Sequence, residues 1–229
     1  MIGIIGAMDK EIDLLLSQMS MLRRDEIADK IFYIGNVAGK EIVIVKSGIG
    51  KVNATITTTL LLNNYDIEYV LNIGIAGGID PVKTGEIVLA SEVSYFDVSL
   101  TAIDDVPYGQ MIGDPLSIST DPTLLQKAKY IFEDKGIKAH IGGLVSGDQF
   151  VTDIEILKPI MAVKDKVISC EMEGMAIAIT CYKFHTPFLS IRGISDIVSS
   201  SNQQQVYQDI SEKIANQTSE FVIHFLEVS

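Results

Sequence analysis

The chain has few cysteines, and that scarcity excludes a disulfide scaffold. Its 229 residues include two cysteines, Cys170 and Cys181, both in apolar surroundings. Their spacing matches no zinc motif, so we expect two buried, unreactive thiols and no bound metal. Thiols that stay reduced are typical of proteins from reducing compartments. We therefore expect a cytoplasmic location.

Positive charge and long apolar runs are scarce as well. The chain has 18 Lys and Arg against 30 Asp and Glu, a net charge of −12. Such an acidic protein repels phosphate backbones, so we expect no nucleic-acid partner. No apolar run approaches the roughly 18 residues of a membrane span, so we expect no membrane contact. The opening segment MIGIIGAMDKE lacks the basic region typical of a signal peptide.

Short runs rich in Ile and Val alternate with helical patterns throughout the chain. This alternation predicts an α/β protein with a mixed, mostly parallel sheet, and one domain over residues 1–229. We expect strands at 1–5, 69–78, 86–96, 141–148, 167–172 and 187–196, and a hairpin at 32–47. We expect helices from about Met8, over 51–64, and from about Pro122, Thr152, Glu173 and Gln203.

Two of these helices have predicted caps, and one segment has no clear period. Asp121 before Pro122 is typical of a helix start, and Thr152 with Glu155 predicts a capping box. Residues 97–120 read as a long loop, and long loops inside compact domains are often functional.

Three acids follow apolar runs, at the places where strands are expected to end. They are Glu11 after GIIGAM, Glu173 in CEMEG and Asp196 in RGISD. In open α/β sheets the carboxyl ends of the strands form the ligand crevice. Each acid alone could be a helix cap or a complement to a helix dipole. Together they favour a site for acid–base chemistry on a small polar substrate.

The glycines near the N-terminus do not form a nucleotide-binding loop. Gly3 and Gly6 do not match the dinucleotide fingerprint, and no P-loop Lys-Ser/Thr follows. These glycines could simply form a tight turn between a strand and a helix, without any function in binding. The next turn holds Asp9, Glu11 and Asp13, and this negative charge makes a poor phosphate site. A carboxylate here suits a general base that acts on water.

Other strand ends carry side chains that suit a flat, hydroxylated ligand. Ala76 and Gly77 allow close backbone approach to a ligand, and Phe150 is either a stacking platform or a core residue. Glu171 and Glu173 lie two apart in a strand, so both can share a face and bind sugar hydroxyls.

These motifs, in this order, resemble the 5′-methylthioadenosine/S-adenosylhomocysteine nucleosidases of the nucleoside phosphorylase/hydrolase superfamily. The resemblance rests on GIIGAM-x-x-E, SGIGKVNA, N-x-G-x-AGG, VSGD-x-F, EME and R-x-x-SD, and it covers nearly the whole chain. It implies a three-layer αβα fold and a homodimer that needs no cofactor. It also implies hydrolysis of the N-glycosidic bond of 5′-methylthioadenosine and S-adenosylhomocysteine, and of 5′-deoxyadenosine, with release of adenine.

The resemblance also implies roles for the acids and their neighbours. Glu11 would activate the water, and Glu173 would hold the ribose hydroxyls while Met172 packs on the sugar. Asp196 would protonate the purine at N7, with Ser195 orienting it. An adenine ring is a poor leaving group unless it is protonated, so the reaction needs such an acid.

The remaining implied contacts surround the base and the sugar. Phe150 would stack on adenine, and the backbone of Val151 would contact the base edge. Met8 and Ile49 would line the ribose and the 5′-substituent, and Arg192 would support the water and Glu11.

Some positions depart from the family pattern near the 5′-substituent. Ile73 and Ile75 replace the usual Thr and Ser, and EMEGMA replaces EMEATA at Gly174 and Met175. The 97–113 loop lacks the usual Phe-Gly-Tyr, and the lid aromatic has Val206 or Tyr207 as its counterpart. Bond cleavage is therefore the firmer expectation, and the identity of the 5′-substituent is left open.

Four alternatives also remain. Two are enzymes on the same fold, a purine nucleoside phosphorylase and an aminodeoxyfutalosine hydrolase. The third is a non-catalytic nucleoside-binding protein, which the presence of Glu11 and Asp196 disfavours. The fourth is a Rossmann module, which the missing dinucleotide fingerprint disfavours.

Overall fold

The computed structural model describes residues 1–228. Its strands are β1 (Ile2–Gly6), β2 (Ser20–Ile27), β3 (Lys30–Val37), β4 (Lys40–Lys46), β5 (Tyr69–Gly78), β6 (Ile87–Tyr95), β7 (Ser117–Ser119), β8 (Ala139–Ser146), β9 (Val167–Glu171) and β10 (Phe188–Ile197). Its helices are α1 (Asp9–Gln18), α2 (Lys51–Asn64), α3 (Pro122–Lys135), the 3-10 turn η1 (Ile154–Leu157), α4 (Lys158–Met161), α5 (Gly174–Lys183) and α6 (Gln203–Glu227). None of these helices is long and apolar enough to cross a membrane.

The strands form one mixed sheet, as the alternating pattern predicts. The order is β10-β6-β8-β9-β5-β1-β4-β3-β2, and β7 pairs with β6. Strand β10 also pairs with β5, so β5, β9, β8, β6 and β10 close on themselves while β1 to β4 extend as an open wing. Parallel pairs join β4, β1, β5 and β10, which brings the ends of β1, β5 and β10 to the same edge.

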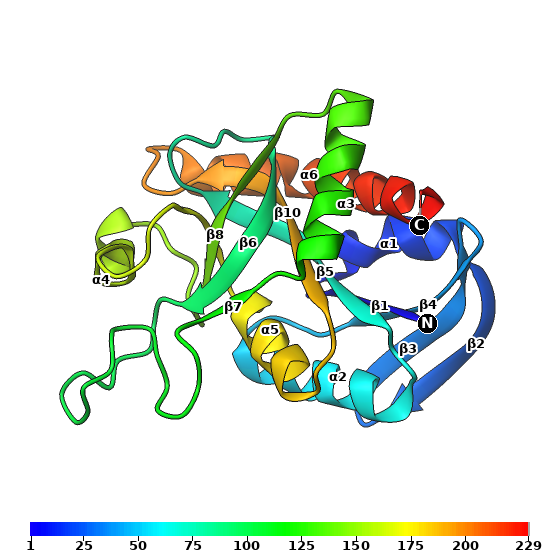
Figure 1. Cartoon of the computed structure of the whole chain (residues 1–229). Coiled ribbons are helices and arrows are strands. Elements are labelled where there is room, and N and C mark those ends of the chain that lie inside the picture. Colours follow the sequence, from blue (N-terminus) through cyan, green and yellow to red (C-terminus); the bar gives the residue numbers. More distant parts are fainter. Residues whose placement is uncertain (229) are drawn as a thin grey trace.

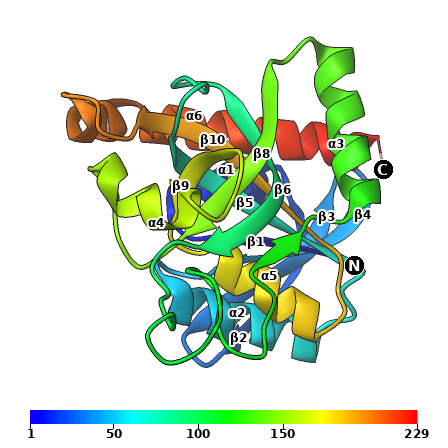
Figure 2. The same cartoon turned by 60° about the vertical axis from the view of Figure 1, so that its left-hand side comes forward.

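Helices cover both faces of the sheet and make three layers. Helices α1, α3 and α6 lie on one side, and α2 and α5 lie on the other (Figures 1 and 2). Neighbouring strand residues point to opposite faces, so Ile4 belongs to the core cluster that contains Phe221 of α6 while Ile5 belongs to the one that contains Ala176 of α5. A strand covered on both faces needs a continuous apolar run, which explains the sequence IGII in β1.

Three local predictions were incomplete or wrong. Strand β2 was missed because SMLRRDEI lies at an exposed edge and has no apolar alternation. The short β7 lies within the segment expected to be loop. The capping box at Thr152 was wrong, because Asp153 is the cap instead and its carboxylate accepts the N–H of Glu155. The cap at Asp121 is confirmed, since its carboxylate accepts the N–H groups of Thr123 and Leu124.

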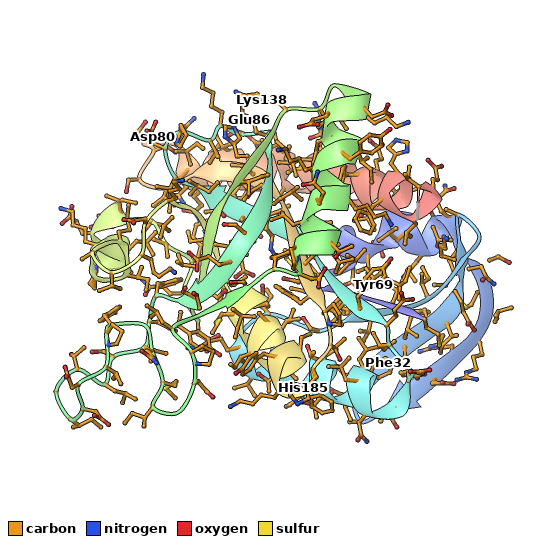
Figure 3. The ribbon with its side chains drawn as sticks, in the orientation of Figure 1. Phe32, Tyr69, Asp80, Glu86, Lys138 and His185 are labelled. Carbon is orange, nitrogen blue, oxygen red and sulfur yellow. The ribbon has the colours of Figure 1, made fainter. Side chains whose placement is uncertain are left out.

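Two contacts hold helix α6 on β10 and the amino ends of β6 and β8 together. A Cβ at Gly193 would lie 2.4 Å from Cγ2 of Ile214, so α6 packs directly on the backbone of β10. At the amino ends of β6 and β8, Lys138 Nζ lies 2.6 Å from Glu86 Oε1, and both residues are labelled in Figure 3. The hydrogen bond from Lys138 lowers the pKa of Glu86 to about 2.

Candidate active site

A pocket opens where β1, β5, β9 and β10 end beside the start of α6. The structure brings the predicted site residues together here, with the exception of Arg192. Those that line the pocket are Met8, Glu11, Ile49, Ala76, Gly77, Phe150, Val151, Glu171, Met172, Glu173, Ser195 and Asp196. Residues from both ends of the chain thus meet because the parallel strands end at one edge.

Glu11 lies in the first turn of α1 and is held by backbone N–H groups. Its Oε2 accepts from Ala7 N at 2.7 Å and from Met8 N at 3.1 Å, and its Oε1 accepts from Ile75 N at 3.0 Å. A Cβ at Gly74 would lie 2.5 Å from Glu11 Oε1, so glycine is needed for this approach. Burial raises the pKa of Glu11, and Arg192 and the three N–H groups partly offset that effect. The carboxylate is fixed in place and is a better base than an exposed one.

Asp196 lies near the end of β10 and also lines the pocket. A bulge between Ile194 and Asp196 shifts the register against β5 and sets the direction of this side chain. Ser195 Oγ donates to Asp196 Oδ1 at 2.5 Å, and Gln203 Nε2 donates to Oδ2 at 2.8 Å. Burial raises the pKa of Asp196 although both hydrogen bonds lower it. A carboxyl group in this setting is suited to carry a proton to a ligand.

Glu173 occupies the N-cap position of α5 and lines the pocket. Its Oε1 accepts from Gly50 N at 2.7 Å, which ties β9 to the turn before α2. Burial, and then the nearby charge of Glu171, raise the pKa of Glu173 to about 8, against the opposing effects of Gly50 and Arg192.

Arg192 and Glu171 form a buried ion pair behind these acids. Arg192 Nη2 lies 2.7 Å from Glu171 Oε2, and the two side chains are 1% and 4% exposed. Arg192 also donates to Asn72 and to the carbonyl of Ile73. Glu171 accepts further hydrogen bonds from Ser146 Oγ and from backbone N–H groups at the start of α5. Both groups are thus engaged with the protein, and the face left to a ligand is that of Glu173.

The mouth of the pocket has an aromatic pair that the sequence left unresolved. The rings of Phe150 and Tyr207 meet edge to face, with centroids 5.3 Å apart. Tyr207 lines the pocket and its hydroxyl lies 3.9 Å from Met8 Sδ, so Tyr207 rather than Val206 lies over the site. Phe150 is 44% exposed and is available for stacking at this mouth.

Sequence reasoning missed several lining residues, of which Gln203 matters most. The others are Ala7, Ile75, Gln149, Cys170 and Tyr207, the last named only as one of two lid candidates. Gln203 stands in a run of three glutamines with no pattern to single it out. Within residues 1–228, no group of three or more His, Cys, Asp or Glu side chains is arranged to hold a metal ion.

Comparisons with known proteins define the class of this fold and site. The family model described as the phosphorylase superfamily matches residues 1–227. A curated 5′-methylthioadenosine/S-adenosylhomocysteine nucleosidase from Staphylococcus epidermidis is 38% identical over 228 residues, which cover 99% of each chain. The chain therefore belongs to the phosphorylase superfamily and, within it, to the family of 5′-methylthioadenosine/S-adenosylhomocysteine nucleosidases.

Two solved structures of similar proteins share this fold over the whole chain. The nucleosidase of this name from Neisseria meningitidis, in complex with methylthio-immucillin-A, has a TM-score of 0.94 and 31% identity, with coverage of 100% of this chain and 99% of the other. A futalosine hydrolase of Helicobacter pylori has a TM-score of 0.92 and 30% identity, with coverage of 100% and 97%.

The raised pKa of Glu173 predicts a pH-dependent effect on stability. The pKa of this side chain is 4.5 in its ordinary state and about 8 in the fold, so folding is favoured below the lower value and loses this contribution as pH rises toward the upper one. Gln at this position stays neutral. We therefore expect the melting temperature of Glu173→Gln minus that of the native protein to be larger at about pH 9 than at about pH 5.

Thermal unfolding at both pH values measures this difference. Glu220→Gln, on the exposed face of α6, is the matched control and should show no such gain. An equal difference at both pH values would contradict the raised pKa.

Proposed function

We propose that this protein hydrolyses the N-glycosidic bond of 5′-methylthioadenosine and S-adenosylhomocysteine, releasing adenine and the 5-thio-substituted ribose. 5′-Deoxyadenosine is a further substrate. One observation carries this proposal: Glu11 and Asp196 line the same pocket and are held by different partners. The family membership and the nucleosidase relatives support it.

Asp196 acts as the general acid at N7 of adenine. The bond breaks through a state with positive charge on the sugar, and the base leaves only when its ring is protonated. Burial favours the protonated form of Asp196, and Ser195 holds its other oxygen. Phe150 stacks on the base, and the backbone of Val151 contacts its edge, while Ala76 and Gly77 allow the base to approach β5.

Glu11 acts as the base that activates water, and Glu173 binds the ribose hydroxyls. The carboxylate of Glu11 places negative charge near the developing cation, which lowers the energy of the transition state. Met172 packs on the sugar, and Met8 and Ile49 line the 5′ side. Arg192 holds Glu171, and its charge lowers the pKa of Glu11 against the effect of burial, so it acts by positioning rather than by touching the substrate.

A purine nucleoside phosphorylase is the nearest alternative, and the pocket disfavours it. A phosphate would need free backbone N–H groups or cations. The N–H groups of Ala7, Met8 and Ile75 are already bound to Glu11. Gly50 N and Lys51 N, at the start of α2, are bound to Glu173 and Asp148. The anion that fills this site is the protein's own carboxylate.

An aminodeoxyfutalosine hydrolase is a second alternative with the same chemistry. The similar futalosine hydrolase of Helicobacter pylori makes it relevant. Ile75 lines the pocket, and the 97–113 loop departs from the nucleosidase pattern, so both changes affect the 5′ side. The residues around the base are unaffected, and both the nucleosidase and the aminodeoxyfutalosine hydrolase would release adenine.

We also infer that the protein works as a homodimer in the cytoplasm, with residues 1–229 as one domain. The family model, which spans 1–227, supports one domain. The unpaired buried thiols Cys170 and Cys181 support a reducing compartment, and cell fractionation tests it. Exposed apolar residues support the dimer. They are Ile49 just before α2, Val52 and Ile56 on α2, and Ile103 and Ile112 in the 97–113 loop.

Loss of the acid should abolish turnover without unfolding the protein. We expect Asp196→Asn to reduce adenine release from 5′-methylthioadenosine by about 10²–10⁴-fold, roughly 3–5 kcal/mol of barrier. An enzyme-coupled adenine assay measures it. Asp209→Asn, on the exposed face of α6, removes the same charge outside the pocket and should keep native turnover. Native turnover in Asp196→Asn would remove this residue from the mechanism.

The apolar face of α2 gives a test of the dimer. We expect Val52→Glu, at a side chain 69% exposed, to shift the mass measured by light scattering from dimer to monomer. A buried charge without a partner is costly at an interface. Tyr130→Glu, on the far side of the sheet at 58% exposed, is the control and should remain dimeric. A monomeric native protein, or a dimeric Val52→Glu, would contradict the proposal.

A further inference from the structure

Gln203 has a carboxamide whose orientation is fixed by the protein. It is the first residue of α6 and is 5% exposed. Its Oε1 accepts the N–H of Ser199 at 3.0 Å, so its NH₂ group must face the other way. There, Nε2 donates to the carbonyl oxygen of Val151 at 2.8 Å and to Asp196 Oδ2 at 2.8 Å.

The two acceptors of this NH₂ group belong to residues that line the pocket. An NH₂ group carries two hydrogens, and here each one satisfies one acceptor. Without Gln203, the Val151 carbonyl and the Asp196 carboxylate would lose these hydrogen bonds, which is costly for partly or fully buried acceptors. A ligand can remove that cost only if it brings the same pair of donors. An exocyclic amine on a flat base is such a group.

We propose that the Gln203 carboxamide is an internal stand-in for the amino group of the base, occupying its two acceptors while the pocket is empty and leaving when the base binds. This inference rests on the proposed function, in which Val151 and Asp196 meet adenine. It assigns to Gln203 a part in base selection. An amino group replaces both lost hydrogen bonds, whereas an oxo group at the same position replaces neither and leaves both acceptors unpaired.

Contacts around Gln203 connect its side chain to the residues at the mouth of the pocket. Ser199 has a φ of +65°, which is unfavourable for a residue other than glycine, and its N–H is the group that holds Gln203 Oε1. Ser199 Oγ in turn accepts the N–H of Ile154 at 2.7 Å, on the segment that follows Phe150. Tyr207 lies one helical turn beyond Gln203 and contacts Phe150. Movement of the first turn of α6 therefore reaches the aromatic pair.

The exchange also fits the chemistry of the acid. The groups that face Asp196 are Ser195 on β10, Gln203 on α6 and the thiol of Cys170 on β9. The hydrogen bond from Gln203 lowers the pKa of Asp196. The amino group of the base donates to the same oxygen, so Asp196 keeps a hydrogen bond at Oδ2 when the base takes the place of the amide.

Adenine binding by calorimetry tests the proposal. Gln203→Met keeps the length and packing of the side chain but removes its donors and acceptor. Because the stand-in no longer competes, we expect adenine to bind about tenfold more tightly than to the native protein. Turnover of 5′-methylthioadenosine should show a lower KM with kcat within about twofold of native, since Gln203 is displaced before the chemical step. Gln204→Met, its exposed neighbour, is the control and should bind adenine as the native protein does.

Opposite results have a definite meaning. If Gln203→Met binds adenine equally or more weakly, and kcat falls, Gln203 stays in place as a permanent support for Asp196 and the proposal is wrong. Native protein that neither binds adenine nor releases it would overturn the proposed function itself, which separates the two failures.

The native protein offers a readout that does not depend on a folded variant. The side-chain NH₂ signals of Gln203 are those absent from the ¹H–¹⁵N spectrum of Gln203→Ala or Gln203→Met. In the free protein we expect them to be protected from exchange with water, because both hydrogens are bound. Saturation with adenine should shift them and remove that protection, whereas hypoxanthine at the same concentration should not. Signals that stay unchanged with adenine would overturn the proposal.

Discussion

The buried ion pair between Arg192 and Glu171 is the interaction on which the rest of the site depends. Three carboxylates, Glu11, Glu171 and Glu173, are buried around one guanidinium. A buried charge is costly unless it is paired and hydrogen-bonded, and removal of one partner from such a pair typically costs about 3–5 kcal/mol. Arg192 joins β10 to β5 through Asn72 and Ile73, and to β9 through Glu171. Arg192 thus both joins these strands and balances the charge of the buried carboxylates.

The two reacting acids, Glu11 and Asp196, have different hydrogen-bond partners. Glu11 is stabilised by three backbone N–H groups and by the charge of Arg192, whereas Asp196 is held by a hydroxyl and an amide. Two carboxyl groups in different environments can serve as base and acid at one pH, which an N-glycosidic hydrolysis needs. Gln203 then connects the acid to α6 and, through Tyr207, to the mouth of the pocket.

Much of this site could be predicted from the sequence because strand ends are easy to find. Glu11, Glu173 and Asp196 follow apolar runs. The parallel pairing of β1, β5 and β10 brings Glu11 and Asp196 to one edge, and β9, paired with β5 and β8, brings Glu173 there. Strand β2 could not be predicted, because an exposed edge strand carries no apolar period. Gln203 could not be predicted either, since its role comes from a turn at Ser199 with positive φ and from acceptors far away in the chain. Likewise, only the folded structure shows that Glu171 pairs with Arg192 while its neighbour Glu173 faces the pocket.

We infer that Glu11 fills the place of an anion and so directs water, rather than phosphate, to the sugar. Adenine release from 5′-methylthioadenosine, compared in phosphate-free buffer and after addition of phosphate, tests it most directly. We expect adenine and free methylthioribose at the same rate in both buffers. Release that requires phosphate, with methylthioribose 1-phosphate as the product, would contradict this assignment of Glu11.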